Sequence, residues 1–461
     1  MNAEPASARQ FLRANNGRHI LHPMISPKET LNGSPLILME GRGVYVKDID
    51  DRWYLDAVGG LWNVNVGHNR PEVNEAIIDQ LGKLAYYSTF GKTSNGPAIE
   101  LSVRLADLLR PEGMTKVLYS TSGSDAVETA LKLARQYQVL IGQPRRTKFF
   151  SLKHGYHGVN FGGLSVSGNP IYHEVFEPLL SGCYQVESPF LYRNPWTDDP
   201  DELAQICAQQ LEREITYQGA QTVAAVIAEP VQGAGGVIVP PAAYWPLLRE
   251  ICDRHQVLLI ADEIVTGFGR TGQMFGSRLW GVKPDIMCFA KGINAGYVPL
   301  GATMISDKVF SAWKDSAQSA PLMHGYTYSG HPLACAAANA VLELVVREQL
   351  PENAAARGSE LLDKLRNLAA ASKIIGDVRG RGLMIGVEFV RDKRTKQPYG
   401  PADAEMKLIG QTCLEQEVLV RMMGNRIILS PALTLASEHV DKIVGAVARA
   451  VEAVEAMGRS Q

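Results

Sequence analysis

Lys291 stands at the end of an apolar run, a position that predicts a reactive amine. In the segment PDIMCFAKG, residues 284–292, most of the side chains before it are apolar. Loss of solvent at such a strand end disfavours the ammonium form and lowers the pKa of a lysine, as an imine-forming nucleophile requires. The plain structural alternative is a lysine whose stem crosses apolar surface and carries its charge to solvent.

Asp262 follows a second apolar run in the same way. Residues 257–261 read VLLIA, and the carboxylate comes next in the chain. In open α/β sheets the carboxyl ends of the strands face the ligand crevice. A carboxylate buried there needs a cationic or N–H partner, and a protonated heterocyclic nitrogen supplies one. A helix-capping or salt-bridged aspartate is the alternative interpretation.

The turn YSTSGSD, residues 119–125, predicts an anion site. It follows an apolar run and precedes a helical pattern of apolar residues. Gly123 lets the backbone approach a ligand closely, the first N–H groups of the helix supply positive potential, and the hydroxyls of Ser122 and Ser124 add donors. Taken alone, an ordinary serine N-cap explains the same residues.

Together, the three stretches predict one cofactor. The predicted anion site, acid and amine match the phosphate, the ring nitrogen and the aldehyde of pyridoxal 5′-phosphate, respectively. A nicotinamide enzyme is the rival hypothesis. The candidate glycine motif for it, GDVRGRG at residues 376–382, lacks the GxGxxG spacing and comes late in the chain.

The elements that must position these residues form an α/β pattern. Between residues 98 and 310, short β-rich runs alternate with helical patterns, and the runs lie at 116–119, 148–151, 222–228, 257–261, 286–290 and 301–305. This alternation predicts a central, mostly parallel sheet with helices on both faces.

The two ends of the chain predict a smaller α+β domain. A hairpin is expected to turn at Asp50 and Asp51, and helical patterns after Pro332 lead to short strands at 383–389 and 426–429 and to a last helix from about Glu438. We therefore expect residues 1–70 and 333–461 to form the small domain and residues 71–332 to form the large cofactor-binding domain.

Composition excludes several other classes of protein. The 461 residues are 46% hydrophobic and 20% charged, with a formal charge of −2, so no excess of basic residues indicates nucleic acid or an anionic membrane as a partner. No apolar stretch reaches the roughly 18 residues of a membrane helix. The 6 cysteines form no CxxC pair, so no metal site is expected and a reducing, cytoplasmic location is favoured.

Longer motifs resemble the class III, fold type I pyridoxal-phosphate-dependent aminotransferases. The run LLIADEIVTGFGRTGQMFG, followed by AKG around Lys291, is similar to the signature of that family. Five further motifs resemble its ω-amino acid:pyruvate (ω-amine) transaminase branch: GLWNVNVGH at 60–68, STSGSDAVETALKLAR at 120–135, HGYHG at 154–158, AEPVQGAGGVIVPP at 228–241 and HGYTYSGHP at 324–332.

The resemblance implies roles for residues around the cofactor. It makes Lys291 the Schiff-base lysine and Asp262 the partner of the pyridine nitrogen, and it places Ser122, Gly123 and Ser124 at the phosphate. It implies further contacts with the ring or the phosphate for a set of other residues: Tyr156 and Ile264 on the two ring faces, Glu229 and Gln232 near the ring hydroxyl, and Thr327 at the phosphate of a neighbouring subunit. Shared active sites imply a homodimer or a dimer of dimers.

The resemblance also implies a substrate pocket. Trp62, Phe90 and Tyr156 match aromatic lining positions, although such residues in α/β proteins usually belong to the core. Arg421 matches the arginine that receives a substrate carboxylate. Related enzymes often carry a second aromatic residue after the Phe90 position, where this chain has Gly91.

The implied function is transfer of an amino group from a terminal amine or ω-amino acid to pyruvate in a ping-pong cycle. The partners are then an amine donor and a keto acid acceptor. GABA, ornithine or diaminopelargonate chemistry with 2-oxoglutarate or another acceptor is the alternative on the same fold. A mutase or decarboxylase, or a non-catalytic binding protein, shares the same cofactor motifs.

Overall fold

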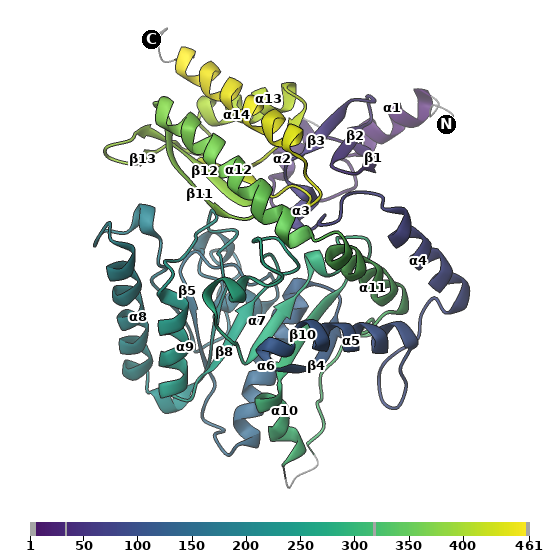
Figure 1. Ribbon diagram of the computed structural model, residues 1–461, viewed down its shortest axis with the longest axis vertical. Helices are drawn as coiled ribbons and strands as arrows, with labels where there is room; N and C mark the ends of the chain where they lie inside the picture. The colour runs from purple at the N-terminus through teal and green to yellow at the C-terminus, as the bar shows by residue number, and fades with distance from the viewer. Residues whose placement is uncertain (1–5, 33–34, 317–319, 458–461) are drawn as a thin grey trace.

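A seven-stranded sheet forms the centre of the larger unit of the chain. The computed structural model describes residues 6–32, 35–316 and 320–457, and Figure 1 shows the larger unit below a smaller one that contains both ends of the chain. The strands lie in the order β4 (Met114–Ser120), β10 (Gly301–Ser306), β9 (Ile286–Phe289), β8 (Leu258–Asp262), β7 (Val223–Ala228), β5 (Lys148–Leu152) and β6 (Cys183–Val186).

The predicted mostly parallel sheet is confirmed. Strands β5 to β9 pair in parallel, whereas β10 runs antiparallel to both β4 and β9. All six runs expected from the sequence correspond to strands of this sheet, and the sequence interpretation missed only the edge strand β6.

Helices cover both faces of this sheet because neighbouring strand residues point to opposite sides. On β8, Leu258 and Ile260 belong to the apolar core under α6 (Gly123–Leu140) and α10 (Asp307–Lys314). Leu259 and Ala261 belong to the core on the other side. That second core is covered by four helices: α5 (Gly96–Leu108), α8 (Pro200–Tyr217), α9 (Tyr244–Arg254) and α11 (Pro332–Arg347).

The smaller unit interleaves the two ends of the chain. One sheet consists of β1 (Leu38–Arg42), β2 (Tyr45–Asp48), β3 (Trp53–Asp56) and β14 (Val418–Leu419), and β14 pairs in parallel with β3. Strands β2 and β3 pair antiparallel around Asp50 and Asp51, which confirms the expected hairpin. The predicted smaller α+β unit from both termini is therefore present, while the exact domain limits stay a prediction.

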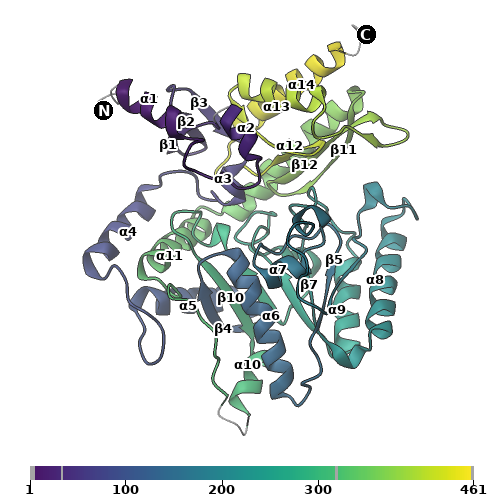
Figure 2. The same ribbon diagram turned by 180° about the vertical axis from the view of Figure 1, so that it is seen from behind.

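The second sheet of the small unit comes from the C-terminal part of the chain alone. Its strands are β11 (Ile375–Arg381), β12 (Met384–Asp392), β16 (Arg426–Leu429) and β15 (Arg421–Met423), with β13 (Gln397–Pro398) paired to β12. The helices α12 (Leu350–Ala371), α13 (Ala404–Glu415) and α14 (Ser437–Met457) lie over these strands, as Figure 2 shows from behind. The last helix begins one residue before the expected Glu438.

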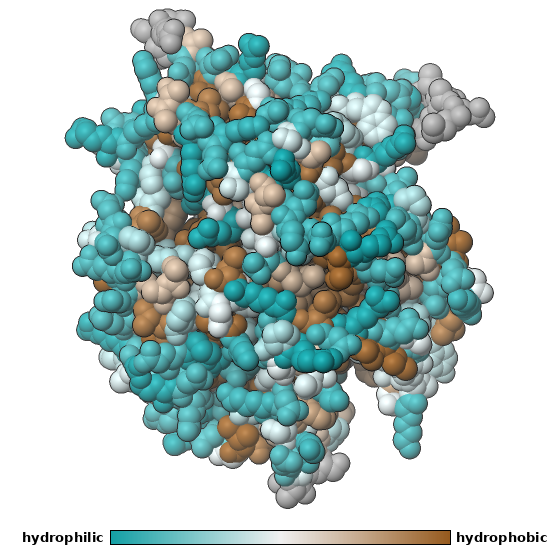
Figure 3. Space-filling model, in the orientation of Figure 1, coloured by the Kyte–Doolittle hydropathy of each residue, from teal (hydrophilic) through white to brown (hydrophobic). Residues whose placement is uncertain are grey.

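The remaining helices are α1 (Ala6–Asn15), α2 (Pro27–Asn32), α3 (Gly59–Trp62), α4 (Pro71–Lys83) and α7 (Phe161–Val166). They join the two units, lie at the surface or, in the case of α7, are buried against α6 in the large unit. The face drawn in Figure 3 is mostly hydrophilic, and its hydrophobic residues are concentrated across the middle of the molecule. A search of the described ranges finds no helix with the length and apolar composition of a membrane span.

Candidate active site

The carboxyl ends of parallel strands meet at one edge of the large sheet, and Lys291 lies there, two residues after β9. Its backbone has φ +47°, which is unusual for a residue other than glycine. Its Nζ lies 5.8 Å from the centre of the Trp62 ring. Loss of solvent around the amine lowers the pKa of Lys291 to about 8, against the opposing effects of Asp262 and Glu229. The expected reactive amine is therefore in place.

Asp262, the last residue of β8, is a buried carboxylate with an ordered set of donors. Its Oδ1 accepts from the backbone N–H of Ile264 at 3.1 Å, and its Oδ2 lies 2.8 Å from Nδ1 of His157. Both side chains are almost inaccessible, at 3% and 1% exposed. His157 Nε2 is buried without a partner among the described residues. The carboxylate is thus held by His157 and the Ile264 amide, and neither a salt bridge with lysine or arginine nor a helix cap accounts for it.

The residues of the predicted anion site lie at the amino end of α6. Ser122 is the N-cap, and its Oγ accepts from the N–H of Asp125 at 3.1 Å, while Ser124 Oγ accepts from the N–H of Val159 at 3.1 Å. The first N–H groups of a helix have no acceptor within the helix and point outward. At Gly123 a Cβ atom would lie 2.9 Å from Ile264 Cδ1, so only glycine lets this turn approach the residues after β8 so closely.

Glu229 and Gln232 follow β7 and are both buried. Glu229 accepts from the N–H groups of Tyr156 at 2.9 Å and Gly233 at 2.7 Å. Burial raises the pKa of Glu229 to about 7, and Asp262 acts in the same direction. Gln232 binds the carbonyl of Lys153 at 2.9 Å and accepts from the Ser188 hydroxyl. Of the two, Glu229 is the residue coupled electrostatically to Asp262.

Arg421 is a cation whose charge acts on this group, and no ion pair among the described residues involves it. It begins β15 and is half-buried. Its charge acts on Lys291, Tyr156 and Tyr172. The alternative of an arginine fixed in a structural salt bridge is therefore not what the structure contains.

Two aromatic residues line the same space from different parts of the chain. Trp62, at the end of α3, is 5% exposed and has φ +64°. Tyr156 is half-buried, and its ring centre lies 5.2 Å from that of Tyr172. Trp62 therefore lies beside the Lys291 amine, and Tyr156 is close enough to Asp262 for that carboxylate to raise its pKa.

Phe90 and Thr327 lie elsewhere, in a second cluster on the surface. Thr327 is exposed and its carbonyl accepts from the Tyr86 hydroxyl at 2.6 Å. Phe90 is 54% exposed, and a Cβ atom on Gly325 would lie 2.9 Å from its Cζ. No hydrogen bond or ring contact in the described part of the chain joins either residue to Lys291 or Asp262. The structure therefore shows no direct link between these two residues and the group around Lys291 and Asp262, and their roles stay predictions.

His157 and Tyr172 complete the site and were missed by the sequence interpretation. His157 stands in the HGYHG motif beside Tyr156, so its position after β5 was an available signal. Tyr172 ends a short 3₁₀ turn, Pro170–Tyr172, inside a long irregular segment. Nothing in the local sequence indicates that this segment folds back over Tyr156.

The residues present fit pyridoxal phosphate. The phosphate requires N–H donors, the pyridine nitrogen requires a buried acid, and the aldehyde requires an amine with a lowered pKa. The amino end of α6, Asp262 and Lys291 meet these requirements separately. Gly123 touches Ile264, which donates to Asp262, and the charge of Asp262 acts on Lys291, so the three are neighbours.

Comparison with known proteins places this arrangement in one family. The family model "Aminotransferase class-III" matches residues 27–451. The chain is 39% identical to the adenosylmethionine-8-amino-7-oxononanoate aminotransferase of Geobacter sulfurreducens, over 96% of this chain and 98% of that protein. It is 36% identical to the putrescine–pyruvate aminotransferase of Pseudomonas aeruginosa, over 96% of each. An amine transaminase from an uncultivated Pseudomonas species, solved in a PLP-bound form, is 53% identical, with a TM-score of 0.93 over 95% of this chain and 99% of that one.

Proposed function

The chain belongs to the class III aminotransferases, which depend on pyridoxal phosphate, and we propose that it transfers an amino group from a terminal amine or ω-amino acid to pyruvate. In the proposed ping-pong cycle the donor gives up its amino group and leaves as an aldehyde or an ω-oxo acid before pyruvate enters. The similarity to an amine transaminase and to a putrescine–pyruvate aminotransferase supports this choice of donor and acceptor.

The proposal depends mainly on one observation: the Arg421 guanidinium, which has no ion pair among the described residues, acts on the Lys291 amine, whose pKa is lowered. One pocket must accept an amine whose tail lacks a carboxylate and then a keto acid that has one. Arg421 acts on Lys291 and on both tyrosines, and no ion pair in the described ranges fixes it. Its fork binds a carboxylate in bidentate fashion, and its long stem allows the charge to move toward solvent when no carboxylate is present.

The proposed mechanism assigns one task to each residue. When bound, pyridoxal phosphate supplies an electron sink for the bond that breaks at the substrate carbon. Asp262 holds a proton at the pyridine nitrogen, and His157 orients the Asp262 carboxylate. Lys291 moves the proton at the substrate carbon, since an amine with a pKa near 8 exchanges protons readily near neutral pH.

The remaining contacts hold the cofactor and the substrate. Ser122, Gly123 and Ser124 would donate to the phosphate from the amino end of α6. The other roles are packing against the two ring faces by Tyr156 and Ile264, hydrogen bonding near the ring hydroxyl by Glu229 and Gln232, and lining of the substrate pocket by Trp62 and Tyr156.

The proposal is tested by a donor and acceptor panel. β-Alanine, GABA, putrescine, cadaverine, taurine and an arylalkylamine are each offered to the loaded enzyme with pyruvate, and alanine is measured. The same donors, with ornithine and diaminopelargonate added, are then paired with 2-oxoglutarate and glutamate is measured. Alanine formation from a terminal amine is expected, whereas turnover with 2-oxoglutarate alone would refute the pyruvate assignment.

Uptake of pyridoxal phosphate by the apoprotein is expected to accelerate as the pH rises through about 8. The pKa of Lys291 is lowered to about 8, so its amine is mostly charged below that pH and mostly neutral and nucleophilic above it. The rate is followed by the growth of the yellow absorbance band in stopped-flow mixing. A rate that stays flat up to pH 10 would show that the amine keeps the ordinary pKa of a lysine.

Arg421→Ala is expected to impair the half-reaction with pyruvate by on the order of 2–4 kcal/mol in transition-state terms, because a desolvated carboxylate loses its partner. The half-reaction with a carboxylate-free amine should change little. Single-turnover bleaching by the amine is compared with single-turnover recovery by pyruvate. Arg449→Ala, on the exposed side of α14, is the control. Equal losses in both directions would remove Arg421 from the substrate site.

We also propose that Phe90 and Thr327 serve the active site of a neighbouring subunit in a homodimer or a dimer of dimers. Both lie outside the site of their own chain. Several large apolar residues around them are exposed, at 52% for Tyr87, 88% for Met323 and 55% for Tyr328. A cluster of this kind is typical of a surface that is covered in an assembly.

Thr327→Ala is therefore expected to weaken retention of pyridoxal phosphate roughly 10-fold, the effect of losing one hydrogen bond to a charged group. Retention is measured by equilibrium dialysis. Because the hydroxyl would serve the other subunit, mixed dimers of a Thr327→Ala chain with a Lys291→Ala chain should contain one normal site, whereas Thr216→Ala on α8 should have no effect. Absence of a normal site in these mixed dimers, after confirmed subunit exchange, would place Thr327 in its own chain's site.

The same proposal places the enzyme in the cytoplasm. All 6 cysteines are free thiols, and Cys207, Cys252, Cys288, Cys335 and Cys413 are buried. Free thiols of this kind are typical of reducing compartments.

A further inference from the structure

Glu388 is a buried carboxylate outside the active site that forms ion pairs with three arginines. Glu388, on β12, is fully buried and binds Arg193 Nε at 2.5 Å, Arg379 Nη2 at 2.9 Å and Arg426 Nε at 3.2 Å. Burial acts to raise the pKa of Glu388, but the three guanidiniums outweigh it and the pKa lies below its usual value. Glu388 is therefore a fixed negative charge that orients its arginines.

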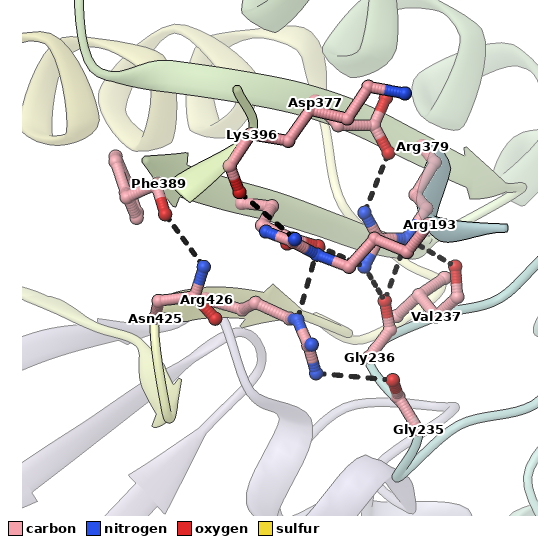
Figure 4. A network of polar contacts seen from close by, with 11 residues as sticks. Arg193, Gly235, Gly236, Val237, Asp377, Arg379, Phe389, Lys396, Asn425 and Arg426 are labelled. Carbon is pink, nitrogen blue, oxygen red and sulfur yellow. Dashed lines mark hydrogen bonds and ion pairs between the residues drawn. The ribbon is translucent and has the colours of Figure 1, made fainter. Parts of the chain in front are cut away.

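Two of these arginines reach across to the large unit. We call residues 233–238, which follow Glu229 and Gln232, the active-site turn. Arg379 donates to the carbonyl of Gly236 at 3.0 and 2.7 Å and to that of Val237 at 3.0 Å. Arg426 donates to the carbonyl of Gly235 at 3.2 Å. Figure 4 shows Arg379 and Arg426 reaching carbonyls of this turn from separate strands, whereas Arg193 donates to the carbonyl of Lys396.

The active-site turn has an unfavourable backbone. Val237 is fully buried and has φ +57°, which is an outlier for a β-branched residue. Gly236 has φ +104°, and a Cβ atom there would lie 2.7 Å from Arg426 Nη1. Such strain persists only where surrounding contacts fix the conformation. Here the contacts that fix the conformation include hydrogen bonds that Arg379 and Arg426, from the small unit, donate to carbonyls of the turn.

The turn is also in direct contact with the active site. The N–H of Gly233 donates to Glu229 Oε2 at 2.7 Å. A Cβ atom on Gly233 would lie 2.7 Å from Cζ3 of Trp62, so the turn packs directly against the indole. A shift of the turn would therefore move a hydrogen-bond donor of Glu229 and one wall of the pocket.

We infer that Glu388, Arg379 and Arg426 are positioning residues for amino transfer, which hold the active-site turn in its strained form and through it Glu229 and Trp62. The small unit thereby sets the geometry of a loop in the large unit. The inference rests on the proposed function for the roles of Glu229 and Trp62, and on contacts in this structure for the rest.

The test uses the loaded enzyme with Arg379→Lys, Arg426→Lys and Glu388→Gln. A lysine keeps the charge beside Glu388, but its single ammonium cannot bond the carboxylate and the turn carbonyls together. Arg391→Lys is the matched control. Arg391 lies on β12, the strand that contains Glu388, and it pairs with Asp403 and Glu405 without touching the turn. Should Glu388→Gln fail to fold, the two lysine variants still decide the question.

Hydrogen exchange measured by mass spectrometry is the first readout. Amides of the active-site turn should exchange at least about 10-fold faster in the three variants and unchanged in Arg391→Lys, since each variant loses a charged hydrogen bond. This readout needs no turnover. A wild-type enzyme inactive on every amine would refute the proposed function, while exchange would still decide whether the arginines hold the turn.

Single-turnover kinetics with the amine donor is the second readout. The rate should fall about 10- to 100-fold, as for other small displacements of a reacting geometry. The charged and titratable groups that face Glu229 include His157, Asp262 and Lys291. With these unchanged, loss of the hydrogen bond from Gly233 should raise the pKa of Glu229 further. The acidic limb of the pH profile should therefore move to higher pH. Unchanged exchange, or faster exchange with an unchanged rate and pH profile, would overturn the inference.

Discussion

Lys291→Ala is expected to abolish turnover, with a loss of about 10⁴-fold or more, while the protein still folds. The variant removes the amine that the structure places beside Trp62 and Asp262, so neither covalent capture of the aldehyde nor proton transfer at the substrate carbon can proceed. The strands around the site are buried by apolar neighbours and do not depend on the amine. Removing a half-buried ammonium whose pKa is lowered should leave thermal stability nearly unchanged.

The measurement is single-turnover conversion of a terminal amine, together with the absorbance spectrum and the thermal midpoint. The yellow band that borohydride abolishes should be missing from Lys291→Ala. It should be present in the control Lys308→Ala, because Lys308 lies on α10 and pairs with Asp285. Exogenous methylamine should restore part of the rate, since it supplies a mobile base. Catalysis near the wild-type rate in Lys291→Ala would refute the mechanism.

Asp262→Asn is expected to slow proton abstraction by about 10²- to 10³-fold while pyridoxal phosphate stays bound. The amide has nearly the shape of the carboxylate, so the contacts with Ile264 N–H and His157 can be kept in part. It carries no charge, however, and cannot hold a proton at the pyridine nitrogen. The proposed phosphate contacts at α6 do not involve Asp262, so retention of the cofactor should change little.

The matched control for this variant is Asp285→Asn. Asp285 is also buried, at 5% exposed, but it lies at the amino end of β9, away from the carboxyl ends of the strands. There it accepts from the N–H of Leu259 and pairs with Arg249 and Lys308. Its replacement should lower the thermal midpoint without the catalytic loss. A substrate kinetic isotope effect on the deprotonated carbon should increase in Asp262→Asn only. Equal rates for Asp262→Asn and the wild type would show that the electron-sink role is misassigned.

Local patterns of the sequence are sufficient to predict the large sheet and the candidate site residues at the carboxyl ends of its strands. Alternating apolar runs and helical patterns predict parallel strands, and parallel strands deliver whatever follows their carboxyl ends to one edge. This is why Asp262, Lys291 and the Ser122–Ser124 stretch were identifiable without coordinates. Each depends only on its distance along the chain from a strand end, which is a local property of the sequence.

Which residues from distant parts of the chain meet at these strand ends depends on how the elements pack together. His157 reaches Asp262 from a loop 105 residues earlier, and Tyr172 returns over Tyr156 from an irregular segment. The freedom of Arg421 from any ion pair in the described ranges depends on what surrounds β15, and the sequence interpretation left that open. The surface position of Phe90 and Thr327 likewise depends on packing between segments far apart in the chain.

The contact between the two units shows the physical reason most clearly. Glu388, Arg379 and Arg426 lie on strands of the C-terminal sheet, and a charge pattern on a short strand is as compatible with a solvated face as with a buried cluster. Their burial, and their bonds to carbonyls of the active-site turn, follow from how two separately formed cores pack together. Strand and helix patterns are set by neighbouring residues, whereas the pairing of buried charges is set by the docking of whole elements, which no local pattern encodes.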